Sequence, residues 1–316
     1  MALGGAAEHR RINCPQRPAE DPVQLEITPL ADEPLGALVR GWDPEEPLDE
    51  ATQNAISKAL SEYLVLVFRG HEQPTDDRLV DFAESFGELI KGSEWFRDVG
   101  DRAEILPVTN VVGDDGIPTG TGGSAQLEWH ADYSYVQQPG KASFLNAVEL
   151  PEDPPCTYFC SQYNALETLD PELVEQLRSL RATHSITEYI VDDEAPRSRD
   201  LHSGFKDKRQ RDKDAGIERP DIPSAEHPVV FVHPDSGREA LYVSKGITRR
   251  ILGLDQAESS ALLKELHLHS TRPESVYAHQ WEVGDIIMFD TVGALHRRDS
   301  WDPKERRVMR QVSTTC

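Results

Sequence analysis

Short segments with the composition of β-strands constrain the fold of this chain more than any other feature. They are rich in β-branched and aromatic residues and are bounded by Gly, Pro or Asp. These segments cover residues 103–110, 142–150, 157–162, 227–234, 239–244, 284–290 and 307–313. Fewer helices are predicted, at about 48–64, 75–87 and 170–180, and one begins at Asp255. Because strands and helices do not alternate, the pattern favours a mainly β fold with flanking helices, either a sandwich or a jelly-roll barrel.

The predicted domain organisation is simple. Residues 1–22 are polar and contain Pro, which indicates a flexible N-terminal arm, and residues 23–316 are expected to form a single domain. The stretch at about 191–226 is charged and has few large apolar residues. A connection this long inside a compact domain is either disordered or a functional lid, so we expect a lid insertion here.

The net charge limits the partners of the chain. Asp and Glu outnumber Lys and Arg by 56 to 33, which gives a formal net charge of −23. Nucleic-acid binding depends on clustered cations, so no nucleic-acid partner is expected. No apolar run approaches the roughly 18 residues that span a bilayer, and the N-terminus lacks the apolar core of a secretory signal. Four cysteines are too few for a disulfide framework. We therefore expect a cytoplasmic protein without a membrane partner.

One His-x-Asp pair is a candidate for metal binding. In the segment LEWHADYSY, one residue separates His130 from Asp132. Side chains at i and i+2 of a strand project from the same face, so this imidazole and this carboxylate would point at one spot. The spacing alone is a weak signal, because a hydrogen-bonded pair gives the same pattern. His233 and Asp235 repeat it within HPDSG, which is typical of a reverse turn, so we interpret that pair as structural.

A third candidate ligand, His296, follows the predicted strand at 284–290. Two histidines and one carboxylate on one face of an octahedron leave three positions open, which suits non-haem Fe(II). A zinc hydrolase can use the same donors, so the ligand set alone leaves the metal open.

Arginines lie on the last predicted strand, in ERRVMRQVS at 305–313. If 2-oxoglutarate bound the metal through its keto acid end, its distal carboxylate would need a partner. Arg binds a carboxylate bidentately and keeps its charge, and a hydroxyl group is a natural helper. On a strand, Arg307 and Gln311 share one face whereas Arg306 and Arg310 share the other, so a slip of one residue would exchange them.

The chain resembles the family of taurine dioxygenase and 2,4-dichlorophenoxyacetate dioxygenase (TauD/TfdA). The resemblance is carried by WHADYSY at 129–135, Thr157, the segment 227–254 and the segment 285–312, in that order. It extends from about residue 23 to the C-terminus. It implies a double-stranded β-helix, a cupin-like jelly-roll barrel with helices packed outside.

The resemblance also implies roles for single residues. His130, Asp132 and His296 would bind Fe(II), with no further catalytic side chain. Thr157 and Arg307 would hold the distal carboxylate of 2-oxoglutarate, and O₂ would be the second cosubstrate. Family members commonly form dimers or tetramers, so a homo-oligomer is expected.

Gln311 departs from the family pattern. The taurine and chlorophenoxyacetate enzymes carry an Arg at this place, near the anionic group of the substrate, whereas Gln brings no charge. We therefore expect a substrate that is not held through a sulfonate or carboxylate at this point. Tyr135 is a second candidate substrate contact, although an aromatic residue in a barrel strand is often part of the core. The acidic composition and Gln311 favour a neutral or cationic small molecule, such as an amino-acid derivative or a natural-product intermediate.

The reaction that the resemblance implies is hydroxylation of an unactivated C–H bond, with release of succinate and CO₂. Asp132 favours hydroxylation over halogenation, because relatives that halogenate lack this carboxylate. Desaturation or cyclisation by the same iron chemistry stays open. A function of another class also stays open, in which the chain is a non-catalytic barrel that binds metal or 2-oxoglutarate.

Overall fold

The computed structural model describes residues 25–95, 102–114, 116, 118–187, 210, 213–218 and 220–316. The predicted arm at 1–22 and most of the predicted lid at 191–226 lie outside the described residues. The last two residues of the predicted lid, Ala225 and Glu226, belong to strand β10.

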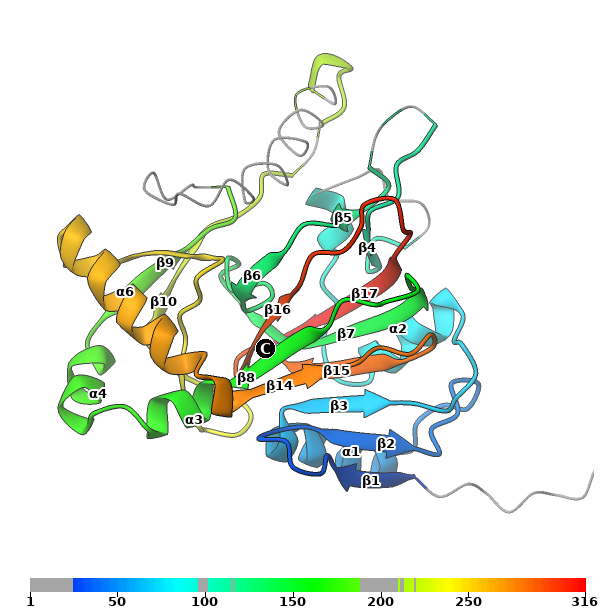
Figure 1. The fold of residues 1–316 in the computed structure, drawn as a ribbon, viewed down its shortest axis with the longest axis horizontal. Coiled ribbons are helices and arrows are strands. Elements are labelled where there is room, and N and C mark those ends of the chain that lie inside the picture. Colours follow the sequence, from blue (N-terminus) through cyan, green and yellow to red (C-terminus); the bar gives the residue numbers. More distant parts are fainter. Residues whose placement is uncertain are drawn as a thin grey trace, which may run out of the picture.

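A large, mostly antiparallel sheet forms the centre of the molecule (Figure 1). Its middle strands β15, β7 and β17 pair antiparallel, whereas β2 with β3 and β4 with β5 are parallel. In sheet order the strands are β1 (Glu26–Pro29), β2 (Ala37–Arg40), β3 (Val65–Phe68), β15 (Ile286–Asp290), β7 (Gly140–Glu149), β17 (Val308–Thr315), β4 (Leu106–Thr109) and β5 (Thr121–Gly122).

A smaller antiparallel sheet faces the large one. Its order is β14 (Val276–His279), β8 (Thr157–Ser161), β16 (Ala294–Arg298) and β6 (Leu127–His130). One apolar cluster joins both sheets and includes Phe159 of β8, Leu295 of β16, Leu145 of β7 and Phe289 of β15. The mainly β jelly roll is therefore confirmed, as a sandwich of two sheets that are not joined by hydrogen bonds into a closed barrel.

Two predicted helices pack against the large sheet. Helix α1 (Glu50–Tyr63) is capped by Asp49, and α2 (Asp76–Glu84) is capped by Thr75, whose side chain accepts from the backbone of the third residue on. Apolar side chains of both helices join strand residues such as Phe144 in a second core cluster. The first two helix predictions are confirmed.

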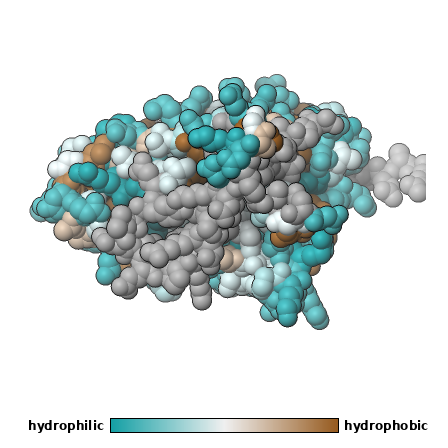
Figure 2. All heavy atoms as spheres, turned by 90° about the horizontal axis from the view of Figure 1, so that it is seen from above, coloured by the Kyte–Doolittle hydropathy of each residue, from teal (hydrophilic) through white to brown (hydrophobic). Residues whose placement is uncertain are grey.

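A side layer completes the fold. In the part of the chain that the structure describes, it holds the helices α3 (Gln162–Glu167), α4 (Pro171–Arg178) and α6 (Gln256–Ser270). The short strands β9 (Arg181–His184), β10 (Ala225–Pro228), β11 (Val230–Val232), β12 (Glu239–Leu241) and β13 (Thr248–Ile251) lie beside them. Single 3₁₀ turns occur at Gly92–Trp95 and Pro273–Ser275. Asp255 and Glu258 form the capping box that opens α6. The face drawn in Figure 2 is mainly hydrophilic where it is coloured, with smaller hydrophobic areas. No helix in the described part of the chain could cross a membrane.

Buried His184 on β9 predicts a loss of stability in acid. Its side chain is buried, and burial lowers its pKa to about 3. Between about pH 6.5 and pH 3 the unfolded chain therefore binds a proton here that the folded chain does not. We expect the replacement His184→Leu to reduce the drop in unfolding free energy between pH 7 and pH 5 by about 2 kcal/mol. Urea unfolding at both pH values checks this, and an identical pH dependence in both proteins would contradict it.

Candidate functional site

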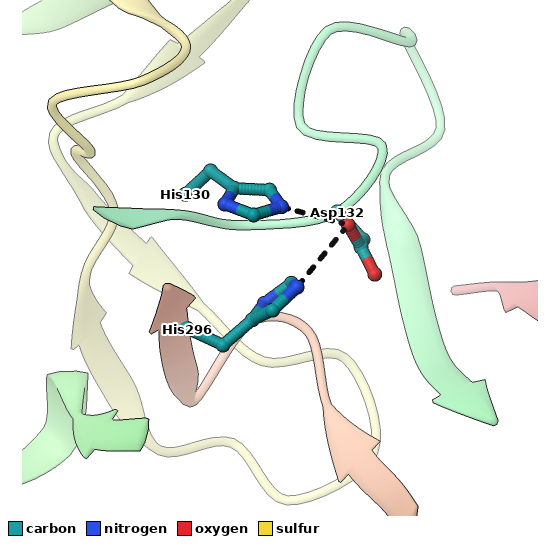
Figure 3. A group of neighbouring side chains, drawn as sticks. All are labelled: His130, Asp132 and His296. Atoms are coloured by element: carbon teal, nitrogen blue, oxygen red, sulfur yellow. Dashed lines mark ion pairs between the residues drawn. The ribbon is translucent and has the colours of Figure 1, made fainter. Parts of the chain in front are cut away.

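The three predicted metal ligands lie together between β6 and β16 (Figure 3). His130 ends β6 and pairs in register with His296 of β16, and their rings lie 4.0 Å apart. Oδ1 of Asp132 is 3.6 Å from Nε2 of His130 and 3.9 Å from Nε2 of His296. One ligand atom from each residue lies within 4.8 Å of the other two.

Asp132 reaches this place by a different route from the one predicted. Strand β6 ends at His130, so Asp132 lies in the following turn and not on the same strand face. Tyr133 next to it has a φ of +55°, in the left-handed region, and this reverses the chain. The argument from i and i+2 on one strand is therefore wrong in its geometry, although the two side chains do converge.

The imidazoles are oriented by their surroundings. Nδ1 of His130 lies 2.7 Å from the backbone oxygen of Glu128, which can only accept, so Nδ1 carries the proton and Nε2 keeps a lone pair. The ring of His296 packs against Phe289 and stacks on Phe159, at centroid distances of 4.8 Å and 5.9 Å. Both side chains thus present Nε2 toward Asp132.

The electrostatics of this cluster suit a cation. Burial raises the pKa of Asp132, while His130 and Gln311 oppose that shift. Burial lowers the pKa of His296 well below its usual value, so this imidazole is neutral at pH 7. A divalent cation would offset the cost of the buried carboxylate and use both lone pairs. The donor set fits a metal with two nitrogen ligands and one oxygen ligand.

The cluster opens into a cavity of about 740 Å³, within the roughly 300–1,000 Å³ usual for small-molecule sites. Asp132 is the only carboxylate among the described residues that line it. Much of the remaining wall is apolar and is formed by Leu106, Val108, Val112, Pro118, Leu127, Leu145, Ile186, Ile222 and Ile247, with Tyr133 and Tyr135. The cavity therefore has a polar end at the cluster and a largely apolar wall.

Arg307 supplies unused hydrogen-bond donors at this cavity. Its side chain is 1% exposed, and its Nε and Nη2 have no hydrogen-bond partner among the described residues. The backbone on either side of the side chain is fixed, because Asn110 accepts from its N–H and Thr109 donates to its carbonyl. Burial lowers its pKa to about 10, so the guanidinium keeps its charge at pH 7. Two aligned donors on a buried cation fit a carboxylate.

Thr157 lines the same cavity as Arg307, and Trp281 contacts both residues. Trp281 donates its indole N–H to Oγ1 of Thr157 at 2.9 Å, and its ring lies 5.9 Å from the Arg307 guanidinium. Because Oγ1 accepts this bond, the hydroxyl hydrogen is available to a further acceptor. The predicted pair of Thr157 and Arg307 is thus brought to one cavity, and Trp281 was not anticipated.

Arg306 and Arg307, which immediately precede β17, differ in their burial. Arg307 is buried, whereas the Arg306 side chain is 58% exposed and pairs with Glu149 at 3.0 Å. The face predicted for Arg307 and Gln311 is therefore the one that lines the cavity.

Arg298 also lies at the cavity, although it was not among the predicted site residues. Arg298 is 4% exposed, lines the cavity, and donates through Nη2 to the carbonyls of Gly122, Gly123 and Ala125. It thereby orders the loop that forms one cavity wall. The sequence signal was present, since Arg298 follows His296 by two residues on one strand.

The two candidate substrate contacts also line the cavity. Tyr135 is buried and belongs to an apolar cluster with Ile90, Tyr133 and Ile247. Gln311 donates from Nε2 to Oδ2 of Asp132 at 2.6 Å, a contact that sequence reasoning did not anticipate.

The second His-x-Asp pair behaves as predicted. Nδ1 of His233 accepts from the backbone N–H groups of Asp235 and Ser236, which closes a turn. Asp235 pairs with Lys141 at 2.6 Å on the surface. Within the described ranges, the metal-like cluster forms at His130 and not at His233.

Comparisons with known proteins identify the family of this chain. The model of the family described as "Taurine catabolism dioxygenase TauD, TfdA family" matches residues 26–313. Pentalenolactone F synthase of Streptomyces avermitilis is 34% identical over 92% of this chain and 94% of its own length. The alpha-ketoglutarate-dependent 2,4-dichlorophenoxyacetate dioxygenase of Cupriavidus pinatubonensis is 33% identical over 89% of this chain and 94% of its own length.

Solved structures give the same result. A taurine dioxygenase from Burkholderia xenovorans superposes with a TM-score of 0.71 at 25% identity, covering 92% of this chain and 89% of that one. AAD-2 in complex with Mn(II) and N-oxalylglycine gives a TM-score of 0.69 at 25% identity, with 92% and 97% covered. This chain therefore belongs to the TauD/TfdA family of Fe(II)- and 2-oxoglutarate-dependent dioxygenases.

Proposed function

We propose that this enzyme hydroxylates an unactivated C–H bond of a neutral, mainly apolar small molecule, and converts 2-oxoglutarate and O₂ to succinate and CO₂. The observation that carries the proposal is the joining of two features in one cavity. Three metal-ligand atoms lie within 4.8 Å of one another, and two buried nitrogen atoms of Arg307 have no hydrogen-bond acceptor among the described residues.

In this proposal each polar group has a separate task. His130, Asp132 and His296 hold the iron, and Thr157 with Arg307 binds the distal carboxylate of 2-oxoglutarate. When bound, the iron supplies the O₂ chemistry that oxidises a strong C–H bond. The protein orients 2-oxoglutarate and the substrate, and the apolar wall of the cavity keeps water from the reacting groups.

The substrate class follows from the cavity wall. A cationic substrate would need a carboxylate, and Asp132, the only one that the described lining offers, is assigned to the metal. We therefore narrow the expected neutral or cationic substrate to a neutral one. The name of the Streptomyces relatives, pentalenolactone F synthase, supports a biosynthetic intermediate over an amino-acid derivative.

A screen for substrate-dependent succinate release tests this proposal. Neutral, rigid apolar compounds are expected to stimulate succinate formation in the presence of Fe(II), and mass spectrometry of the product should show one added oxygen atom. A product with two fewer hydrogen atoms would indicate desaturation or cyclisation instead. If strongly charged compounds are the best substrates, the proposed class is wrong.

We further propose that the enzyme works in the cytoplasm as a homodimer or homotetramer. Its cysteines within the described residues, Cys156, Cys160 and Cys316, are free thiols, which suits a reducing compartment. The oligomer rests on the family resemblance, and analytical ultracentrifugation tests it.

Trp281 is expected to support cosubstrate binding through Thr157. The replacement Trp281→Phe keeps an aromatic ring and removes the N–H donor, which costs about 1 kcal/mol for a neutral hydrogen bond. We expect the KM for 2-oxoglutarate to rise about fivefold with little change in kcat. In a Thr157→Val background the same replacement should have almost no effect, because the acceptor is gone. Equal effects in both backgrounds would contradict the role.

A further inference from the structure

The two oxygen atoms of Asp132 have different partners. Oδ1 faces Nε2 of both His130 and His296, at 3.6 Å and 3.9 Å. Oδ2 accepts a hydrogen bond from Nε2 of Gln311 at 2.6 Å. The carboxylate is thus held with one oxygen toward the imidazoles and the other toward an amide.

Gln311 is well placed to fix this orientation. It lies on β17, which pairs with β7 on one side and β4 on the other, and it stands opposite Leu145 and Leu106. The residue is 8% exposed. Asp132 itself lies in a turn, where the backbone restrains a side chain less than it does inside a sheet. A strand in the middle of the large sheet therefore holds a carboxylate that belongs to a turn.

The amide also leaves the charge of Asp132 intact. A carboxamide donates a hydrogen bond without bringing a positive charge. An Arg or Lys in contact with Oδ2 would neutralise part of the carboxylate and compete with a bound cation. Gln311 restrains Asp132 without placing a positive charge beside the carboxylate.

We propose that Gln311 is a positioning residue for the metal site, which holds Oδ2 so that Asp132 offers only Oδ1 to the metal. This rests on the proposed metal site. It differs from the expectation that Gln311 acts mainly on the substrate, and the two roles separate by measurement. A positioning residue changes metal affinity before any substrate is added, whereas a substrate contact changes only the KM for the substrate.

The test is anaerobic titration of the purified protein with Mn(II) by isothermal calorimetry. The replacement Gln311→Met keeps the length of the side chain and removes the donor, and Gln311→Leu removes the donor with a shorter apolar side chain. We expect both variants to bind Mn(II) more weakly, by about tenfold to a hundredfold, as on loss of an outer hydrogen-bond partner of a ligand. The control Gln138→Met makes the same change at an exposed amide that contacts Thr315, and should bind Mn(II) like the parent.

The possible outcomes distinguish a failure of the proposed metal site from a failure of the proposed role of Gln311. If the parent protein binds no divalent metal, the proposed metal site itself is wrong. If the parent binds Mn(II) and both Gln311 variants fold and bind it equally well, only the positioning role is wrong. Unchanged Mn(II) affinity with a raised KM for the substrate would assign Gln311 to substrate binding. Circular dichroism establishes whether each variant is folded. If the first Gln311 variant does not fold, the second is used for the titration.

Discussion

Replacing Asp132 by alanine is expected to lower succinate formation by more than about a hundredfold. Loss of an outer hydrogen-bond partner of a metal ligand costs about 10- to 100-fold, and loss of the ligand itself should cost more. The reason is geometric, because Oδ1 of this residue is the only carboxylate oxygen of the described residues near Nε2 of both His130 and His296. Two imidazoles alone would hold a divalent cation weakly. Succinate formation at fixed Fe(II), together with Fe(II) affinity, measures the effect.

Asp235→Ala is the matched control. Asp235 stands in the same His-x-Asp spacing, but it lies in a turn and pairs with Lys141 at the surface. This variant should keep the activity and Fe(II) affinity of the parent. Similar losses in both variants would mean that Asp132 acts through general stability and not through a metal.

The second large effect is expected from Arg307→Lys. Lysine keeps the charge but cannot present two parallel N–H donors to a carboxylate. A hydrogen bond to a charged group contributes about 1.5–3 kcal/mol, so the KM for 2-oxoglutarate should rise about 10- to 150-fold. Steady-state kinetics with 2-oxoglutarate varied and substrate saturating checks this.

Arg306→Lys makes the identical change one residue away. Arg306 points to the surface and pairs with Glu149, so its replacement should leave the KM for 2-oxoglutarate unchanged. The comparison also tests which of the two neighbouring side chains faces the cavity, since the opposite assignment would reverse the two results. A raised KM in Arg306→Lys alone would contradict the assignment of Arg307.

Much of the fold could be predicted from local sequence. The predicted strand segments contain β4, β8, β11, β12 and β15 and cover most of β7 and β17, and the predicted helices match α1, α2, α4 and α6. Strands of only four residues with mixed polarity, such as β9, carry no periodic signal and were not anticipated. Helix α3 was missed because the strand segment at 157–162 runs directly into it, with Ser161 as its cap.

The site was predicted through residue types more than through geometry. His130, Asp132 and His296 converge, yet Asp132 does so from a turn whose course depends on Tyr133 in a left-handed conformation. The contact between Gln311 and Asp132 joins residues 179 apart in sequence, and no local pattern encodes it.

The predicted lid at 191–226 stays a prediction. Ile222 within this stretch lines the cavity and packs against the cluster of Ile90, Tyr133, Tyr135 and Ile247. Part of the stretch therefore borders the site, as a lid would require.

The most direct measurement of the central claim is an anaerobic absorption spectrum. Adding Fe(II) and then 2-oxoglutarate to the parent protein should produce a visible charge-transfer band, because only iron that is chelated by the keto acid gives one. Asp132→Ala should lack this band under the same conditions, and Asp235→Ala should retain it. A parent protein that gives no band, or a band that persists in Asp132→Ala, would contradict the assignment of this cluster as the site where Fe(II) and 2-oxoglutarate meet.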